Sequence, residues 1–520
     1  MKAALTFAQR TILVFSLVFA FAPIVLTQQS TECNVRVTLL QVNDVYQFTP
    51  VDQGTKGGLA RVLTLRRAIQ QENPNTLFLL AGDTISPSVE SITYKGAQMI
   101  EAWNAVGLDY ATFGNHEFDF GPDVLKDRMK ESKFGWVAAN VIEKSTGKVF
   151  GTAAPFVIRE FGGVKIGIFG LVLPETKTTS RPGADVEFLN PCDTAKAMVN
   201  EIHSHGAKVV VALTHLSMRE DKEVARCSGV NLIIGGHEHT LLQSYAGGAP
   251  IFKMTADGRE LGRFDLNISK TSGELSSIDW EVIEVNSETA EDPLFSSVYR
   301  KYSGLLAALD QPVGRTSVAL DGRSAENRTH ETNVGNLVAD SFRKALVSDV
   351  AMVNGGSIRV DEIIRAGKLT ERDVLSILPF KNRLIKIEVT GALLREALEH
   401  GVSQVAPNAQ PGGFPQVSGM KFSYDASKPA GQRVVDFTIN GRPVSPTKKY
   451  SLATSTFIAN DGGDGYSMFK GSRVITSPEV APLDSDALRR VIATGRPIAP
   501  KVEGRVQRLD KTVATRSECN

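Results

Sequence analysis

Short apolar segments that end in polar, glycine-flanked residues constrain this sequence most. Five segments rich in β-branched residues each lead into Asn, Asp or His, a pattern that predicts buried strands. Residues 35–42 precede Asn43-Asp44, 76–81 precede Gly82-Asp83, 110–113 precede Gly114-Asn115-His116-Glu117, 208–213 precede Thr214-His215, and 230–234 precede Gly235-Gly236-His237-Glu238-His239. Four of the eight histidines in the chain lie at these ends. Because ligands bind beyond the carboxyl ends of strands in an open α/β sheet, the sequence predicts a site there.

Amphipathic stretches separate these strands and define the fold class. Residues 59–72 and 194–204 carry apolar side chains at three- and four-residue spacing, which predicts helices. Residues 164–173 add another strand, and the alternation predicts an α/β class. The second half mixes helices with strands, and residues 292–309 predict one connecting helix. The expected divisions are a signal peptide at 1–30, a first domain at 31–288, a linker helix at 289–312, a second α/β domain at 313–512 and a tail at 513–520.

The amino-terminal segment predicts export. Lys2 and Arg10 precede an apolar stretch, 11–26, that ends in polar residues, as in a secretory signal peptide. The stretch contains Pro23 and is shorter than the ~20 residues that span a bilayer, which favours cleavage over an uncleaved anchor helix. We therefore expect a secreted or periplasmic product without membrane attachment. With 58 Lys and Arg against 57 Asp and Glu, no global charge attracts nucleic acid, so we expect no nucleic-acid partner.

The four cysteines permit two disulfides in an oxidising compartment. Proximity favours Cys192–Cys227 within the first domain and Cys33–Cys519 between the termini. The alternative is that the cysteines are free, buried thiols.

The residue types at the strand ends predict metal chemistry. Carboxylate, amide and imidazole groups together bind Mn, Zn, Fe or Co, and a carboxylate can bridge two metals. A single Asp at a strand end is more often a helix cap or a turn residue, and a single His is more often an ordinary hydrogen-bonded group. Recurrence at five strand ends in one domain favours a metal site.

These motifs resemble known families. Asn43-Asp44, Gly82-Asp83-Thr84, Gly114-Asn115-His116-Glu117-Phe118-Asp119, Thr214-His215 and Gly236-His237-Glu238-His239 resemble the motifs of calcineurin-like metallophosphoesterases. Segments 331–340, 354–359, 378–383 and 462–466 resemble the carboxy-terminal domain of secreted 5′-nucleotidases, which include UDP-sugar hydrolases and ecto-5′-nucleotidases. The resemblance implies an αββα sandwich, followed by a second α/β domain that binds substrate.

The resemblance also implies roles for the first-domain residues. Asp83 would bridge two divalent cations (Zn, Mn, Co or Fe), and the remaining ligands would be Asn115, His215 and His237 at one site and Asp44 and His239 at the other. His116 would contact the phosphate and Asp119 would orient His116, while a metal-activated hydroxide attacks phosphorus. The sequence departs from the family at Tyr46, where a ligating His is usual. We expect Tyr46 to be a packing residue; the alternatives are a weaker site, a water in place of the His, or a harder metal that ionises the phenol.

For the second domain the resemblance implies a nucleotide-binding site. Arg359, Asn382 and Arg383 would face phosphate and base, Phe414 and Phe457 would stack on the base, and Asp464 would bind the ribose. The alternatives are core packing for the Phe residues and a turn at Gly462-Gly463-Asp464-Gly465. The spacing from Phe457 to Asp464 is one residue longer than in the family.

The sequence therefore predicts a secreted dimetal phosphohydrolase that acts on nucleoside 5′-monophosphates. The first alternative is a related phosphatase for nucleoside di- or triphosphates, UDP-sugars, cyclic nucleotides or non-nucleotide esters. The second is a catalytically weak nucleotide-binding protein.

Overall fold

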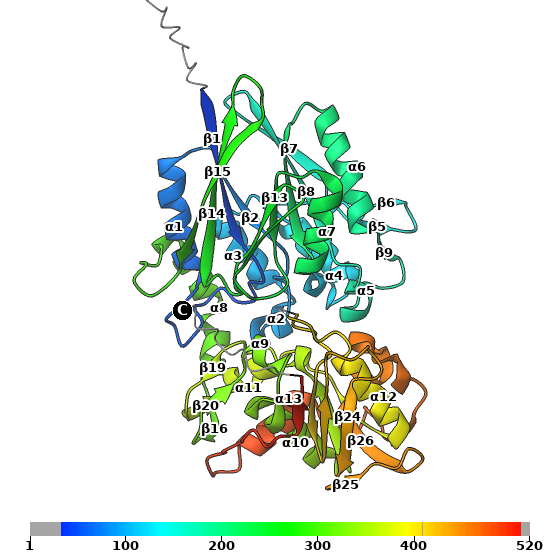
Figure 1. Ribbon diagram of the computed structural model, residues 1–520. Coiled ribbons are helices and arrows are strands. Elements are labelled where there is room, and N and C mark those ends of the chain that lie inside the picture. The colour runs from blue at the N-terminus through cyan, green and yellow to red at the C-terminus, as the bar shows by residue number, and fades with distance from the viewer. Residues whose placement is uncertain (1–32, 408, 511–520) are drawn as a thin grey trace, which may run out of the picture.

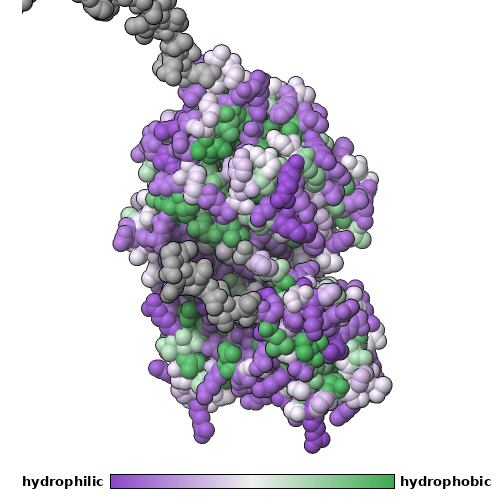
Figure 2. Space-filling model, viewed as in Figure 1, coloured by the Kyte–Doolittle hydropathy of each residue, from purple (hydrophilic) through white to green (hydrophobic). Residues whose placement is uncertain are grey.

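The computed structural model describes residues 33–407 and 409–510, which form two α/β domains stacked end to end (Figure 1). The expected signal peptide, the tail and Cys519 lie outside the described residues. Figure 2 shows that the visible face of the molecule is mostly hydrophilic.

Two six-stranded sheets build the first domain. The first has the order β15 (Leu275–Glu284), β14 (Glu260–Ser269), β1 (Asn34–Val42), β2 (Thr76–Leu80), β3 (Tyr110–Ala111) and β4 (Gly135–Trp136). The second has the order β12 (Leu242–Ala246), β13 (Ala249–Lys253), β11 (Leu232–Gly235), β10 (Val209–His215), β8 (Val164–Val172) and β7 (Phe156–Phe161).

The sheets pack face to face between two layers of helices. Val37, Leu39, Ile168 and Val211 are buried between the sheets. The helices over the first sheet are α1 (Leu59–Glu72), α3 (Ala97–Val106) and α4 (Pro122–Glu131), and those over the second are α6 (Pro191–Ser204) and α7 (Met218–Ser228). The expected αββα sandwich is confirmed. The expected Cys192–Cys227 disulfide is present and joins α6 to α7.

A five-stranded sheet forms the centre of the second domain. Its order is β22 (Pro415–Ser418), β18 (Val350–Asn354), β26 (Lys449–Ser455), β21 (Leu384–Thr390) and β27 (Arg473–Thr476). One face packs against α10 (Asn333–Leu346) and α13 (Asp484–Ile492). The other face packs against α12 (Gly391–Val402) and a sheet of β25 (Arg442–Pro443), β24 (Val434–Ile439), β23 (Met420–Tyr424) and β28 (Val506–Arg508).

Short elements complete the two domains. The helices are α2 (Val89–Tyr94), α5 (Thr176–Thr179), α9 (Ser324–Asn327) and α11 (Glu371–Ile377). The strands are β5 (Val141–Glu143), β6 (Lys148–Val149), β9 (Val186–Phe188), β16 (Pro312–Thr316), β17 (Leu320–Asp321), β19 (Ile363–Ile364) and β20 (Gly367–Thr370).

Helix α8 (Ser296–Leu309) connects the domains. A 3₁₀ turn, Pro293–Phe295, precedes it, so the single helix expected over 292–309 begins as a tighter turn. Val298 and Tyr302 bury their side chains in the core of the first domain. Within 33–407 and 409–510, no helix combines the length and the apolar character needed to cross a bilayer. The expected domain limits stay predictions.

Candidate active site

Parallel strand register gathers the polar strand ends at the edge of the first domain that faces the second domain (Figure 1). In the first sheet Val42 pairs with Leu80, and in the second Thr214 pairs with Gly235. The segments that follow these strands therefore emerge side by side. This register explains why residues far apart in sequence meet at one site.

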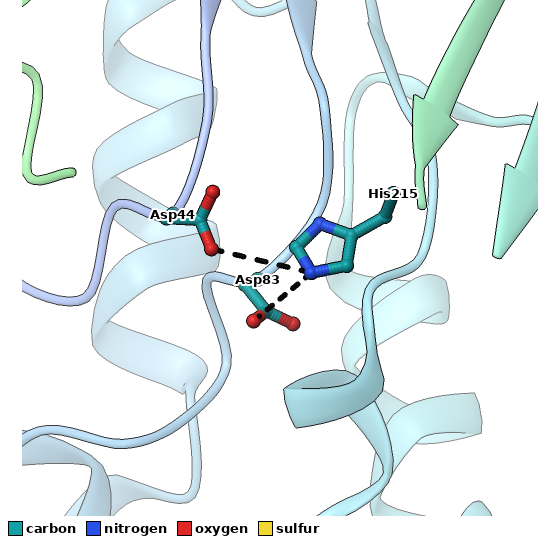
Figure 3. A group of neighbouring side chains, drawn as sticks. All are labelled: Asp44, Asp83 and His215. Atoms are coloured by element: carbon teal, nitrogen blue, oxygen red, sulfur yellow. Dashed lines mark ion pairs between the residues drawn. The ribbon is translucent and has the colours of Figure 1, made fainter. Parts of the chain in front are cut away.

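Asp44, Asp83 and His215 form a buried cluster, with one ligand atom from each residue lying within 4.8 Å of the others (Figure 3). His215 Nε2 lies 3.2 Å from Asp83 Oδ2 and 4.0 Å from Asp44 Oδ1. His239 adds its Nε2 atom 3.2 Å from Asp44 Oδ1. The His237 ring lies 5.2 Å from the His215 ring, measured between centroids.

The backbone at these residues is unusual. Four residues of the site have φ angles in the left-handed region, which residues other than glycine rarely adopt. The angles are 52° at Asp44, 59° at Asp83, 88° at His237 and 52° at His239. The His237 N–H donates to Asp44 Oδ2 at 2.8 Å and helps to hold this conformation. Because strained backbone persists only where the surroundings fix it, four such angles beside one cluster are consistent with a functional site.

Glu117 and Gly114 fix the Asp83 loop. The Glu117 carboxylate accepts from the backbone N–H groups of Asp83 and Thr84, at 2.9 and 2.6 Å. A Cβ atom on Gly114 would stand 2.2 Å from Asp83 Oδ1, so only glycine allows this approach. Burial, with a smaller contribution from Asp83, raises the pKa of Glu117 to about 7. Glu117 is part of a motif in the sequence, but its anchoring role was not predicted.

The donor set fits divalent cations. Among the described residues, the buried Asn115 Oδ1 and His215 Nε2 atoms make no hydrogen bond. His215 Nδ1 donates to the Ala81 carbonyl at 2.8 Å, which leaves Nε2 directed at the carboxylates. Although burial acts to lower it, Asp83 and Asp44 raise the pKa of His215 to about 10. A cation coordinated by these atoms would take the place of that proton.

Tyr46 corrects one expectation. Its hydroxyl lies 3.2 Å from Asp44 Oδ1, 3.2 Å from Asp83 Oδ2 and 2.8 Å from His239 Nε2. The expectation of a simple packing role is wrong, because the hydroxyl hydrogen-bonds the same side chains that the resemblance assigns to the metals. Burial raises the pKa of the phenol well above its usual value, so it is a neutral donor here.

His116 and Asp119 form a hydrogen-bonded pair beside this cluster. His116 Nδ1 lies 2.8 Å from Asp119 Oδ2, and Ser180 Oγ donates to the other Asp119 oxygen at 2.7 Å. His116 Nε2 lies 4.0 Å from Asp83 Oδ2. Phe380 of the second domain stacks on the His116 ring, with centroids 5.9 Å apart. The pair therefore lies where the two domains meet.

Two arginines of the second domain, Arg359 and the buried Arg328, act electrostatically on Tyr46. The Arg359 guanidinium lies 5.0 Å from the centre of the Tyr46 ring. Within the described part of the chain, Arg359 Nη2 and Arg328 Nε are buried without a hydrogen-bond partner. Burial and the neighbouring charge of Arg359 lower the pKa of Arg328. Arg328 was not predicted, because its segment lies outside those that resemble the 5′-nucleotidase carboxy-terminal domain.

The other polar residues that were predicted to bind substrate, Asp464, Asn382 and Arg383, have different hydrogen-bond partners. Asp464 accepts a hydrogen bond from Asn354 at 2.6 Å. Asn382 accepts from the backbone of Asp484 at the start of α13, and Arg383 donates to the Pro478 and Ala481 carbonyls within the second domain. Among the interactions of the described residues, neither Asn382 nor Arg383 contacts the Asp44–Asp83 cluster.

The two predicted stacking rings have unequal exposure. Phe414 is 0% exposed in the core of the second domain, so its ring offers no face to a base, and the expected stacking role disagrees with this arrangement. Phe457 is only partly buried. A π-helix spans Phe457–Asp461, and its wider turn accommodates the extra residue between Phe457 and Asp464.

Two further charged groups, the buried Lys253 and the partly exposed Asp361, were not predicted. Lys253, 0% exposed, pairs with Asp221 at 2.8 Å and with Glu238, and donates to the Gly236 carbonyl at 2.9 Å. It thereby supports the loop that carries His237 and His239. Asp361 of the second domain hydrogen-bonds His239 at 3.2 Å. A lysine within the apolar strand β13 was the only sequence signal for either group.

Comparisons with known proteins agree with this arrangement. Residues 37–241 match the family described as calcineurin-like phosphoesterase, and residues 312–471 match the 5′-nucleotidase carboxy-terminal domain. The chain is 30% identical over 523 residues to the snake venom 5′-nucleotidase of Naja atra, covering 90% of this chain and 98% of that protein.

A bacterial structure and a longer bacterial protein are also similar. The crystal structure of the 5′-nucleotidase precursor from Thermus thermophilus is 30% identical, with a TM-score of 0.85 over 92% of this chain and 100% of that one. The trifunctional nucleotide phosphoesterase protein YfkN of Bacillus subtilis is 31% identical over 500 residues. That match covers 86% of this chain but 34% of YfkN, so the chain spans about a third of that protein's length. The chain belongs to the 5′-nucleotidase family, with a calcineurin-like phosphoesterase domain followed by a 5′-nucleotidase carboxy-terminal domain.

Proposed function

We propose that this protein is a metal-dependent 5′-nucleotidase that hydrolyses nucleoside 5′-monophosphates to nucleoside and phosphate. The observation that carries the proposal is the pair of second-domain arginines, Arg359 and Arg328. Each has a buried N–H group without a hydrogen-bond partner among the described residues, and both act electrostatically on Tyr46 beside the Asp44–Asp83–His215 cluster. Two cations with free, buried donor groups favour an anion beside them, and a guanidinium fork suits phosphate. The family membership makes a nucleotide the natural source of that phosphate.

The metal site in this proposal consists of two divalent cations. Asp83 would bridge them, with Asn115, His215 and His237 at one position and Asp44 and His239 at the other. When bound, such cations lower the pKa of a coordinated water and neutralise phosphate charge. Zn, Mn, Co and Fe all suit this set of carboxylate, amide and imidazole donors.

The remaining side chains would position and stabilise the phosphate. Asp119 accepts the Nδ1 proton of His116 and fixes the ring, so that Nε2–H is directed at the cluster and can donate to a phosphate oxygen. Phe380 covers the ring and reduces access of water. Asp464 would accept from the ribose hydroxyls and Phe457 would stack on the base, as proposed for this chain from its resemblance.

A phosphatase for non-nucleotide esters is the second candidate. The full burial of Phe414 favours it, because only one of the two expected stacking rings is partly exposed. Phosphate release from AMP and from a plain phosphate monoester separates the two proposals. We expect a higher kcat/KM for AMP; a clear preference for the plain ester would refute the nucleotidase assignment.

Export is part of the proposal. The Cys192–Cys227 disulfide supports an oxidising compartment such as the extracellular space or the periplasm. Detection of the protein in culture medium or periplasmic extract tests this, and retention in the reduced cytoplasmic fraction would contradict it.

A further inference from the structure

His239 lies between two carboxylates from different domains. Its Nδ1 atom lies 3.2 Å from Asp361 Oδ2 of the second domain. Its Nε2 atom lies 3.2 Å from Asp44 Oδ1 and 2.8 Å from the Tyr46 hydroxyl. Because a carboxylate only accepts, Nδ1 carries the proton that is shared with Asp361. Nε2 is therefore the atom directed at the cluster of the first domain.

Asp361 is itself held in one orientation. Its Oδ1 atom accepts from the Ser324 N–H at 2.6 Å, which leaves Oδ2 for His239. Its backbone carbonyl accepts from Arg259 of the first domain at 3.3 Å. Its φ angle of 45° lies in the left-handed region. Contacts from both domains thus fix this carboxylate against the His239 ring.

His215 offers an internal comparison. Its Nδ1 atom donates to the Ala81 carbonyl at 2.8 Å, so its orientation is set within the first domain. His239 has its equivalent partner in the second domain. The two histidines therefore differ in the origin of the group that orients the ring. For His239, but not for His215, that group is in place only when the two domains are in contact.

We propose that Asp361 is a positioning residue that orients His239 for metal binding, so that one of the two metal sites is completed across the domain boundary. The inference rests on the proposed metal pair. Groups that hold the second ring nitrogen of a ligating histidine fix its tautomer and typically change metal affinity 10–100-fold. By linkage, metal binding at that site and contact between the domains favour each other.

Metal titration of the full chain tests the proposal. The protein is stripped with chelator and titrated with Mn²⁺, and bound metal is measured by equilibrium dialysis with elemental analysis. We expect Asp361→Ala to weaken one of two sites by about 10–100-fold and to leave the other unchanged. Asp361→Asn should be intermediate, because its single acceptor oxygen must serve both Ser324 and His239. Thermal unfolding of the stripped variants checks that each one is folded.

Gln410→Ala is the matched control. It removes another hydrogen bond between the domains, from Gln410 Nε2 to Thr240 Oγ1 at 2.6 Å, beside His239 but away from its ring. Unchanged Mn²⁺ affinity in this control supports a specific role for Asp361. Equal weakening in Gln410→Ala, or two unchanged sites in the Asp361 variants, overturns the inference while the proposed function stands. Absence of Mn²⁺ binding by the unaltered chain would overturn the proposed function and the inference with it.

Discussion

In the first domain the ends of strands position the site residues, whereas in the second domain the site residues lie in loops that face the first domain. Asp44, Asp83, His237 and His239 follow strand ends directly and lie in left-handed conformations. Arg328, Arg359 and Asp361 instead lie in the segments that follow α9 and the 3₁₀ turn Gly355–Ser357 of the second domain. The first arrangement fixes Asp44, Asp83 and His237 within one domain, while His239 also contacts Asp361 of the second domain. The second depends on how the two domains meet, so we expect metal binding and substrate recognition to respond differently to mutation.

The largest effect expected from a single side chain is on turnover in His116→Ala. The variant loses the imidazole that would donate to phosphate, and kcat should fall by about 10²–10⁴-fold. Elemental analysis should find metal content unchanged, because His116 lies beside the cluster rather than in it. Asp119→Asn should cause a smaller loss, since it disturbs only the orientation of the ring. Loss of metal in His116→Ala would show that this role is misassigned.

Arg328→Ala tests the contribution of the second domain. We expect KM for AMP to rise by about 10–100-fold, the equivalent of the roughly 1.5–3 kcal/mol of a hydrogen bond to a charged group. The kcat value should change less, because the metal cluster is intact. Arg328→Lys should recover only part of the loss, since an ammonium lacks the fork geometry. Lys344→Ala, an exposed change in the same domain, is the control; a KM unchanged in Arg328→Ala would contradict the phosphate-binding role.

Tyr46→His tests how the first domain tolerates its departure from the family. An imidazole coordinates metals better than a neutral phenol, so the affinity of one site should rise by about tenfold. Tyr46→Phe should leave both affinities nearly unchanged, because it removes only the hydrogen bonds to Asp44, Asp83 and His239. Mn²⁺ titration measures both variants. If Tyr46→Phe abolishes a site, the phenol is itself a ligand.

The smallest expected effect is on stability at the domain boundary. Burial, followed by the charge of Asp52 in the first domain, raises the pKa of Glu362 to about 7. The folded state therefore favours protonated Glu362, and this contribution is full below the ordinary carboxyl pKa and is lost as pH rises through about 7. Glu362→Gln should reduce the difference in Tm between pH 5 and pH 8 by about 2–4 °C, the shift that 1 kcal/mol produces in a domain of 150–250 residues.

Thermal unfolding at the two pH values measures this effect. An unchanged difference in Glu362→Gln would show that the carboxyl does not titrate at the boundary. Lys344→Ala again serves as a surface control with no expected change in pH dependence.

Local patterns in the sequence predicted most of the first domain. Helix α1 has the predicted limits, and the strands that carry the proposed ligands lie within a few residues of those expected. Asp44, Asp83 and His215 could be predicted to meet, because parallel strands bring their carboxyl ends to one edge. The antiparallel strands β14 and β15, which complete the first sheet, carry no comparable motif and were not predicted.

Contacts between the domains could not be predicted in the same way. Arg328 and Asp361 reach the site only because the two domains pack together, and no periodicity encodes that packing. Tyr46 was misjudged because residue type alone does not show where a hydroxyl points. Phe414 was misjudged because a motif position does not show whether its neighbours bury the ring.

Metal content and its link to activity test the central claim most directly. Purified full-length protein is analysed for bound metal, and AMP hydrolysis is measured before chelation, after chelation and after metal is restored. The account predicts two divalent cations per chain, loss of hydrolysis on chelation and recovery on readdition. AMP hydrolysis that continues in protein free of metal would contradict it.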